Sequence, residues 1–534
     1  MKEKEKKRIK TTYSYLLVFS ILLGSFLRFY HIGGQPLWLD EAYSHWFSSR
    51  TMHELWTIVP QFETNPPFYY TILKIWRILF GSSEAGLRSL SAIISIGCIF
   101  LVFMLGRFMG NSIGGNWVGA IGALLFSVFP LHIQYAQEAR SYAMLTFATT
   151  LTLCTFLWII RNPAEACEPI IRKMVDAKQH SKNGIIWSNF LPWLTMAVAI
   201  SFTLWLHDTA VLYIFTLYLI MLAWFFFQLR SNRTFLGNMM TVSAVVFLLW
   251  GPYLVFLIPQ AMSEALPIPT PTVVSAMHGV ILLLLGQGIS WNATVNDFVK
   301  MAIFTFLIIL AIVGLLNIRR HSGPYVSLLL LGSIVGPILM ELLYSFLFRP
   351  IFVERTLIYV SVPFFVAISA GIMMMRDPRK RVLVVMIIAL IFLRWSNSYY
   401  TNYKKEPWDK VAQTIVQHAN GDVVLLVPNN IEFPFSYYAK RNNNDNLQIV
   451  PLPCPFEDYL HPVPRFDRPS YDDDMRPSDV PTINNAIAGK SPIWLITRRE
   501  DLFDPDRIVF NALMQKRDVI STWNFQGISV IKFN

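Results

Sequence analysis

The chain has 534 residues, of which 54% are hydrophobic, 14% aromatic and only 15% charged, with a mean hydropathy of +0.43. A soluble protein carries about 25% charged residues, so this composition excludes a soluble multidomain enzyme, and the long apolar runs exclude an outer-membrane barrel. The net charge of +11 is unevenly distributed. Residues 1–400 contain 30 Lys/Arg and 17 Asp/Glu, a net charge of +13, whereas residues 401–534 contain 15 Lys/Arg and 17 Asp/Glu, a net charge of −2. Because the excess positive charge lies in short loops between apolar runs, it predicts membrane orientation and not nucleic-acid binding.

Eleven apolar runs are long enough for membrane helices, which need about 20 residues each. They lie near residues 13–30, 86–108, 115–131, 142–160, 189–206, 210–228, 239–259, 298–317, 325–348, 356–375 and 382–400. The sequence therefore predicts an α-helical polytopic membrane protein. A series of glycines at 110, 114, 115, 119 and 122 predicts close helix packing and not a phosphate loop, since no strand precedes it.

Basic residues from Lys4 to Lys10 precede the first run, which predicts a cytoplasmic N-terminus. If successive spans alternate in direction from that N-terminus, 20 of the 30 basic residues of positions 1–400 lie on the inner side, but only 6 of the 17 acidic residues do. Eleven spans then place the C-terminal residues outside. We expect a multi-pass protein of the cell membrane with an extracytoplasmic C-terminal domain.

The first outer loop, residues 31–85, is unusually long and predicts interfacial helices. Apolar stripes at residues 43–47 and 55–59 indicate two short helices, and Thr51 with Glu54 has the pattern of a capping box before the second. Pro66 and Pro67 predict the start of a third amphipathic helix, which continues to residue 80.

The outer segment 260–297 contains the apolar stretch 278–286 after four prolines. A lid, a re-entrant helix and a twelfth span all fit this pattern, and the choice for residues 273–290 stays open at this point.

Residues 401–534 have the composition of a soluble α/β domain. Helices are predicted at 408–418 and 507–515, buried strands at 423–427, 448–452 and 493–497, and a final hairpin at 519–533. The domain organisation is thus a transmembrane domain over residues 1–400, with the interfacial helices in its first outer loop, followed by residues 401–534.

Polar side chains gather at the outer ends of the predicted spans. Ionisable groups near membrane depth are costly and indicate a water-filled cavity or a substrate site. The candidate catalytic residues are Asp40, Glu41 and Glu138, and the candidate substrate-binding residues are Asn65, Lys74, Arg140, Tyr142, His207, Asp208, Arg349 and Arg355. Asp40 either caps the first interfacial helix or acts as a general base, and both roles can hold together.

Simpler interpretations exist for most of these residues. Arg140 could pair with Glu138, the two later arginines could be anchors at the membrane surface, and His207–Asp208 could be an ordinary turn. Lys74 could contact lipid headgroups, and Glu341 could pair within the helix bundle. A divalent metal between Asp40 and Glu138 is a further alternative, although the sequence has no dense carboxylate cluster there.

Several strings resemble those of integral-membrane GT-C glycosyltransferases, especially dolichyl-phosphate-mannose protein mannosyltransferases and lipid A aminoarabinose transferases. They are PLWLDE at 36–41, NPPFYY at 65–70, Leu87-Arg88, QYAQEARSY at 134–142, His207 and FVERT at 352–356. The resemblance covers residues 15–375 in order and spacing and is weaker beyond 401. Relatives more often have Tyr-Leu where this chain has Thr356-Leu357.

The resemblance implies a GT-C fold and inverting transfer of a single sugar from a polyprenyl phosphate to a lipid, glycan or protein acceptor at the outer face. It implies Asp40 as the base, Arg140, Arg349 and Arg355 as phosphate ligands, and His207 as a hydrogen-bond donor to phosphate. Glu138 would orient Arg140 or the acceptor. The absence of a Trp-Trp-Asp string argues against transfer of a whole glycan. The alternative function class is a multi-pass transporter or lipid flippase, although no internal repeat is present.

Overall fold

The computed structural model describes residues 3–61, 63, 65–163, 186–228, 232–262, 269–288, 295–442, 446–456 and 474–534. Two compact units divide the chain. The first unit comprises Met1–Tyr30, Thr64–Tyr69 and Ser89–Asn402, and the second comprises His31–Glu63, Tyr70–Arg88 and Tyr403–Asn534. The second unit therefore joins most of the first outer loop to the C-terminal domain.

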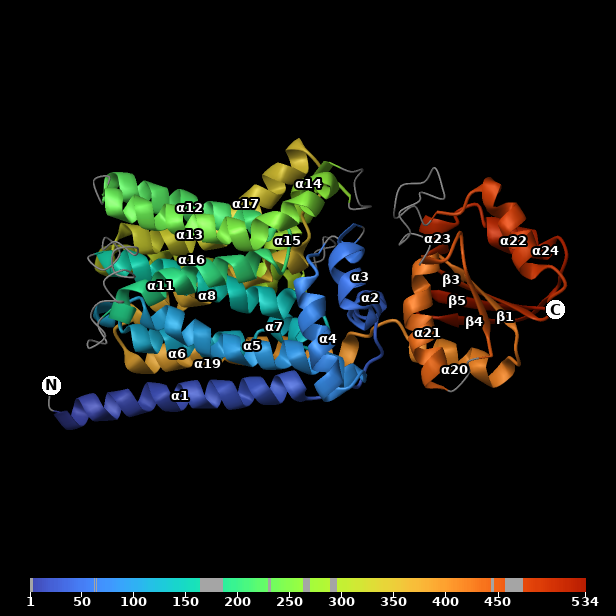
Figure 1. Cartoon of the computed structure of the whole chain (residues 1–534). Helices are drawn as coiled ribbons and strands as arrows, with labels where there is room; N and C mark the ends of the chain where they lie inside the picture. Colours follow the sequence, from blue (N-terminus) through green and yellow to red (C-terminus); the bar gives the residue numbers. More distant parts are fainter. Residues whose placement is uncertain are drawn as a thin grey trace. The chain divides into compact units, whose positions relative to one another are not determined.

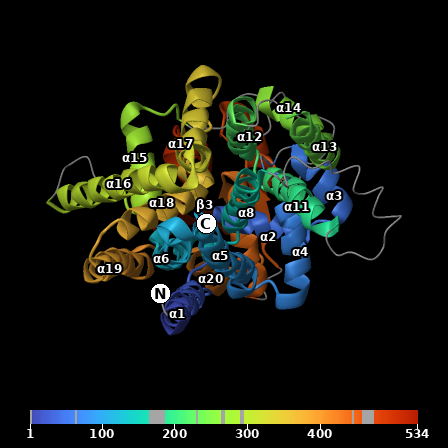
Figure 2. The ribbon, with the colours of Figure 1, turned by 90° about the vertical axis from the view of Figure 1, so that its left-hand side faces the viewer.

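The first unit is a bundle of helices (Figures 1 and 2). Within the described residues, nine helices are long and apolar enough to cross a membrane. They are α1 (Glu3–Phe29), α5 (Glu84–Arg107), α8 (Tyr142–Arg161), α12 (Ala210–Phe227), α13 (Arg233–Trp250) continued by α14 (Leu254–Met262), α16 (Val295–Ser322), α17 (Pro324–Leu347), η4 (Glu354–Val360) continued by α18 (Ser361–Met373), and α19 (Pro378–Asn402). The prediction of a polytopic helical membrane protein is confirmed.

The two remaining predicted runs also form helices, but not simple spans. Run 115–131 becomes α6 (Gly115–Val128) and α7 (Pro130–Ala136), which are bent by 62° relative to each other. Pro130 explains the break, because it lacks an N–H for the helix ladder and forces Phe129 into an extended conformation (φ −73°, ψ 128°). Run 189–206 becomes α11 (Ile186–Leu204), whose apolar part Leu191–Leu204 is shorter than a full span.

Glycines allow some helices of the first unit to approach closely. A Cβ atom added at Gly119 of α6 would fall on the backbone carbonyl of Phe103 in α5. In α16 and α18, a Cβ atom at Gly314 would fall on the carbonyl oxygen of Ala367, and one at Gly371 on that of Leu310. The packing role predicted for the glycine series is confirmed at Gly119.

Helix α15 (Val273–Leu285) corresponds to the undecided outer segment. Its 13 residues extend about 20 Å at 1.5 Å per residue, less than the roughly 30 Å of a bilayer core. It packs against the segment before η4, since a Cβ atom at Gly279 would lie 2.9 Å from atoms of both Phe352 and Glu354. The interpretation as a twelfth complete span is therefore wrong.

The second unit begins with the helices of the first outer loop. They are α2 (Leu39–Ser49), α3 (Met52–Thr57), η1 (Val59–Gln61) and α4 (Phe68–Phe80), most of which belongs to this unit. The predicted capping box at α3 is present: the Glu54 N–H donates to Thr51 Oγ1 at 3.2 Å, and the Thr51 N–H donates to Glu54 Oε2 at 2.8 Å.

The C-terminal part of the second unit is built on a five-stranded sheet of order β2-β1-β3-β5-β4. Its strands are β1 (Val423–Val427), β2 (Gln448–Pro451), β3 (Ile493–Arg498), β4 (Val519–Phe525) and β5 (Ile528–Phe533). β1 pairs in parallel with β2 and β3, whereas β5 is antiparallel to β3 and β4. All the predicted strands and the final hairpin are confirmed.

Helices cover both faces of this sheet. α20 (Trp408–His418) and α21 (Glu432–Arg441) pack on the face that carries Val424 and Leu426. α22 (Val480–Ile487) and α24 (Ile508–Met514) pack on the opposite face. The short elements η5 (Asn429–Ile431), η7 (Pro477–Asp479) and α23 (Glu500–Phe503) complete the described part. Alternation along β1 supplies apolar side chains to both layers, which explains its uninterrupted apolar sequence.

Candidate functional site

Two arginines of the first unit share one aromatic ring. The guanidinium carbon of Arg140, from the turn between α7 and α8, lies 5.8 Å from the centre of the Tyr142 ring. The guanidinium carbon of Arg355, in η4, lies 6.0 Å from the same ring. Arg140 and Tyr142 are buried, and Arg355 is partly exposed. The structure thus brings together three of the predicted substrate-binding residues.

His207 lies in the turn between α11 and α12 and belongs to the same electrostatic environment. Its Nδ1 atom accepts a hydrogen bond from the backbone N–H of Thr209 at 3.2 Å. This contact assigns the proton of the neutral ring to Nε2. Burial, together with the positive charges of Arg140 and Arg355, lowers the pKa of His207 to about 3. His207 is therefore a neutral hydrogen-bond donor at physiological pH.

A buried carboxylate that the sequence analysis did not include among the site residues lies beside this cluster. Glu341 of α17 is fully buried and accepts a hydrogen bond from Thr356 Oγ1, which lies 3.4 Å from both carboxylate oxygens. Thr356 directly follows Arg355 in η4, and its hydroxyl also lies 2.7 Å from the Val353 carbonyl oxygen, so Glu341 lies against the turn that carries this arginine. Its position inside an apolar run was the available signal.

Arg140, His207 and Arg355 together offer two cations and one neutral donor at the loop ends of membrane helices. Guanidinium groups bind phosphate through two parallel hydrogen bonds, and a neutral imidazole N–H adds a further donor. This chemistry suits an anionic group such as a phosphate.

In the second unit, Asp40 lies in the first turn of α2 and is partly buried. The helix begins at Leu39 after Trp38, and no side chain caps this end. The prediction that Asp40 caps this helix is wrong, because Asp40 lies one residue inside it. Its backbone carbonyl accepts a hydrogen bond from Ser44 Oγ at 3.1 Å.

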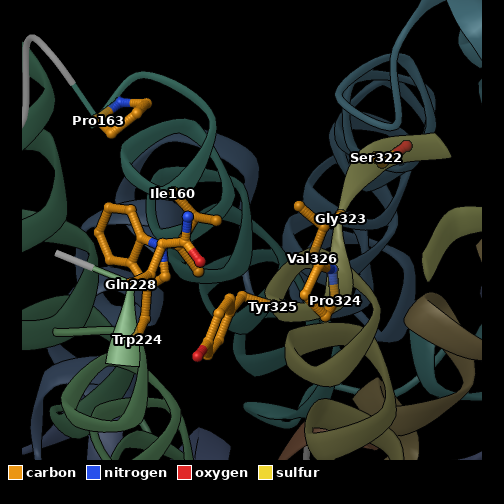
Figure 3. Close-up of a pocket in the computed structure, with 9 residues that line it drawn as sticks. All are labelled: Ile160, Pro163, Trp224, Gln228, Ser322, Gly323, Pro324, Tyr325 and Val326. Atoms are coloured by element: carbon orange, nitrogen blue, oxygen red, sulfur yellow. The ribbon is translucent and has the colours of Figure 1, made fainter. Parts of the chain in front are cut away.

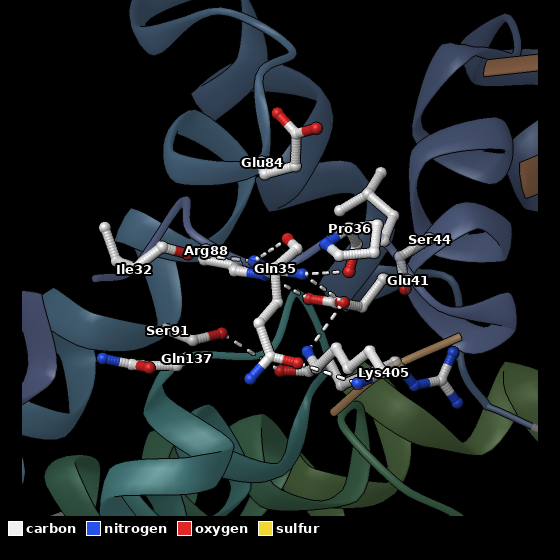
Figure 4. A network of polar contacts seen from close by, with 12 residues as sticks. Ile32, Gln35, Pro36, Glu41, Ser44, Glu84, Arg88, Ser91, Gln137 and Lys405 are labelled. Atoms are coloured by element: carbon white, nitrogen blue, oxygen red, sulfur yellow. Dashed lines mark hydrogen bonds and ion pairs between the residues drawn. The ribbon is translucent and has the colours of Figure 1, made fainter. Parts of the chain in front are cut away.

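The neighbouring residue Glu41 is fully buried between two cations (Figure 4). Arg88 donates to its two carboxylate oxygens at 2.7 Å each, and Lys405 Nζ donates to Oε2 at 2.8 Å. Burial alone would raise the pKa of Glu41, but Arg88 and Lys405 lower it to about 2. With these contacts, Glu41 is better suited to hold a loop in place than to accept a proton.

Two of the remaining candidate residues donate to backbone carbonyl oxygens. Lys74 Nζ donates to the carbonyl oxygen of Arg50 at 2.5 Å, and an Nη atom of Arg349 donates to that of Gln260 at 2.6 Å. Asn65 and Glu138 are buried, and Asp208 is partly buried. No group of three or more His, Cys, Asp or Glu side chains in the described ranges could hold a metal ion.

A pocket of about 380 Å³ lies at other loop ends of the first unit (Figure 3). Its lining comes from the end of α8, the end of α12 and the turn between α16 and α17. Trp224, Gln228 and Tyr325 line it, and none of the predicted site residues does. It is therefore separate from the arginine cluster, which lies at the start of α8.

Comparison with known proteins identifies similar structures. No family model and no curated protein matches the sequence. The solved structure of ArnT, a lipid A aminoarabinose transferase from Cupriavidus metallidurans, is 12% identical with a TM-score of 0.61, and the similarity covers 98% of both chains. The chain has the GT-C fold.

Two further GT-C structures contain prenyl phosphates. The structure of the same ArnT bound to undecaprenyl phosphate has a TM-score of 0.60 at 12% identity, again over 98% of both chains. The oligosaccharyltransferase AglB from Archaeoglobus fulgidus, in complex with an inhibitory peptide and a dolichol-phosphate, has a TM-score of 0.57 at 13% identity. That similarity covers 97% of this chain and 74% of AglB. The resemblance predicted from the sequence is confirmed at the level of the fold.

Proposed function

We propose that this chain is an inverting glycosyltransferase that moves a single sugar from a polyprenyl phosphate to a lipid, glycan or protein acceptor at the outer face of the membrane. The observation that carries the proposal is the cluster of Arg140, Tyr142 and Arg355 with the neutral donor His207. Full-length similarity to a GT-C structure that holds undecaprenyl phosphate supports a prenyl phosphate as the anion.

The proposed reaction needs one proton acceptor and several phosphate ligands. Asp40 takes the proton of the acceptor hydroxyl, whose oxygen attacks the anomeric carbon as the bond from that carbon to the phosphate oxygen breaks. The electron pair leaves with the prenyl phosphate, which is stable as an anion and needs cations more than an acid. Arg140 and Arg355 are the proposed phosphate ligands, and a positioned carboxylate contributes about 10²–10⁴-fold to the rate.

The other candidates keep supporting roles in the proposal. Glu138 orients Arg140 or the acceptor, and Tyr142 holds the two guanidinium groups through its ring face. Asn65, Lys74, Asp208 and Arg349 are proposed substrate contacts. Chelation tests the alternative of a divalent metal ion: loss of transfer that Mg²⁺ or Mn²⁺ restores would support it.

The test combines lipid analysis with turnover. Mass spectrometry of lipid that co-purifies with the protein should detect a prenyl phosphate or its sugar conjugate. Asp40→Asn should retain the folded state and the bound lipid but lose transfer, by about 10²-fold or more, because an amide is not a base at neutral pH. Wild-type turnover in this variant would exclude Asp40 as the base. Solute or lipid transport in proteoliposomes without any sugar transfer would contradict the proposed function.

A further inference from the structure

The second unit contains a buried charge network that connects the first outer loop to the start of the C-terminal domain. Glu41 lies in α2, Arg88 in the first turns of α5, and Lys405 between α19 and α20. All three side chains are almost completely buried, with relative exposures of 2% or less. One carboxylate thus joins three segments that are far apart in the sequence.

Backbone groups of the loop complete the network (Figure 4). The guanidinium of Arg88 also donates to the carbonyl oxygens of Ile32, Gln35 and Pro36 at 2.8–2.9 Å. The side-chain amide of Gln35 donates to the Tyr403 carbonyl at 2.9 Å and accepts from the Lys405 N–H at 2.8 Å. Residues 32–36, which lead into α2, are therefore fixed from both sides.

Aromatic packing holds the other end of the same helix. Tyr43 and Trp46 of α2 lie 4.7 Å and 4.8 Å, between ring centres, from Phe433 of α21. Both also contact Phe456, with ring centres 5.5–5.6 Å apart. The Leu37 N–H donates to the Tyr438 hydroxyl of α21 at 2.7 Å. Contacts from the C-terminal domain therefore extend along α2 from Glu41 to Trp46.

We infer that Lys405 and the C-terminal domain that it introduces serve as the positioning device for α2, the helix that carries the proposed base Asp40. Lys405 Nζ, at the start of the C-terminal domain, donates to Glu41 Oε2 of α2 at 2.8 Å. This inference rests on the proposed function for its catalytic consequence. The physical link itself, between Lys405 and α2, does not depend on that function.

The Glu41–Arg88–Lys405 network carries a net charge of +1, so removing Lys405 leaves a neutral Glu41–Arg88 pair and removes one buried, charge-assisted hydrogen bond. In a Lys405→Met variant, Glu41 retains Arg88, but α2 loses its charged connection to residue 405. A base displaced by about 1 Å can lose about 10²-fold in rate without a change in substrate binding. A defect in kcat with an unchanged KM is therefore the expected signature.

The experiment compares Lys405→Met with Lys404→Met and Lys405→Arg in the full chain. Lys404 is the adjacent residue and is exposed, which makes it a matched control. For Lys405→Met we expect kcat to fall about 10- to 100-fold while the KM for a prenyl-phosphate sugar changes less than about twofold. Lys404→Met should match the wild type, and Lys405→Arg should recover most of the lost rate because it retains the charge.

Amide hydrogen exchange supplies a readout independent of catalysis. Exchange in peptide 39–49 should accelerate about tenfold or more in Lys405→Met, while peptide 508–514 in α24 stays unchanged. Unchanged exchange in peptide 39–49 would overturn the inference, as would an equal acceleration in both peptides, which indicates general destabilisation. If the wild-type protein transfers no sugar, the proposed function fails, and the exchange data still decide whether Lys405 positions α2.

Discussion

His207 is held in its neutral form by its surroundings. Its pKa in the folded protein is about 3, whereas an unperturbed imidazole has a pKa near 6.5. The unfolded chain therefore binds more protons than the folded one between these values. The contribution of His207 to stability is complete above about pH 6.5 and is lost as the pH falls towards 3.

A consequence for activity follows from this neutral state. We expect His207→Gln to lower kcat/KM for transfer while leaving the shape of its pH profile between pH 5 and 8 unchanged, because the wild-type ring does not titrate there. The measurement is kcat/KM against pH for both proteins. If kcat/KM of the wild type changed near pH 6.5 and this change were absent from His207→Gln, the neutral state assigned to His207 would be contradicted.

Arg140 and Arg355 allow a direct test of phosphate binding. Each Arg→Gln variant should bind undecaprenyl phosphate about tenfold or more weakly, since a charge-assisted hydrogen bond contributes about 1.5–3 kcal/mol. Arg→Lys variants should fall between the wild type and Gln, because lysine keeps the charge but loses the forked geometry. Equilibrium binding in detergent measures the effect. Arg320→Gln, an exposed change at the end of α16, is the control and should bind normally.

The sequence could predict some of these residues and not others. Arg140, His207 and Arg355 lie beside apolar runs, and Tyr142 belongs to a string that resembles GT-C enzymes, so the sequence was sufficient to propose all four. Lys405 follows the last span in the same way as Lys404, and nothing in the sequence distinguishes the two. Only the tertiary structure shows that Lys405 meets Glu41 and that its neighbour stays exposed.

At the scale of elements, membrane helices were predictable because the requirement is local. In lipid, the backbone N–H and C=O groups of a span of about 20 apolar residues must hydrogen-bond to one another, which a helix achieves. All eleven predicted runs contain helices. Helix α21 was not predicted, because its sequence EFPFSYYAKR combines an interior proline with aromatic residues and no regular apolar period. It forms where Phe435 and Tyr438 are buried against the sheet, which is a property of the fold.

The contact between α16 and α18 should be sensitive to a single methyl group. Gly314→Ala places a Cβ atom on the Ala367 carbonyl oxygen, and such overpacking costs about 1–3 kcal/mol. Gly237→Ala in α13 meets no atom within 4 Å and should be neutral or stabilise by about 0.5–1 kcal/mol. Thermal unfolding in detergent compares the two. If Gly314→Ala and Gly237→Ala had equal melting temperatures, the close contact between α16 and α18 would not contribute to stability.

At the scale of the whole molecule, the charge distribution predicts the orientation in the membrane. In a variant without native cysteines, a cysteine introduced at Gln515 should react with a membrane-impermeant maleimide in intact cells, whereas one at Arg320 should react only after permeabilisation. Both positions are exposed in the structure, so labelling reports the side of the membrane. The opposite pattern would invert the topology and would place the proposed reaction on the cytoplasmic face.

The fold of residues 15–375 was predictable through strings that resemble GT-C enzymes, although identity to the solved structures is only 12–13%. The association of the first outer loop with the C-terminal domain was not, because it depends on contacts between distant segments. Tyr438, for example, accepts from the Leu37 N–H and donates to Glu84 at 3.0 Å. Such pairs have no local signature.

The network around Glu41 also orders events during biosynthesis. Lys405 leaves the ribosome 364 residues after Glu41, once all the apolar helices of the first unit have been synthesised. Until then the nascent loop has Arg88 but lacks its second cation and its aromatic partners. A chain that stalls before residue 403 would therefore expose this loop to proteases, so the maturation of the helix that bears Asp40 is tied to completed translation.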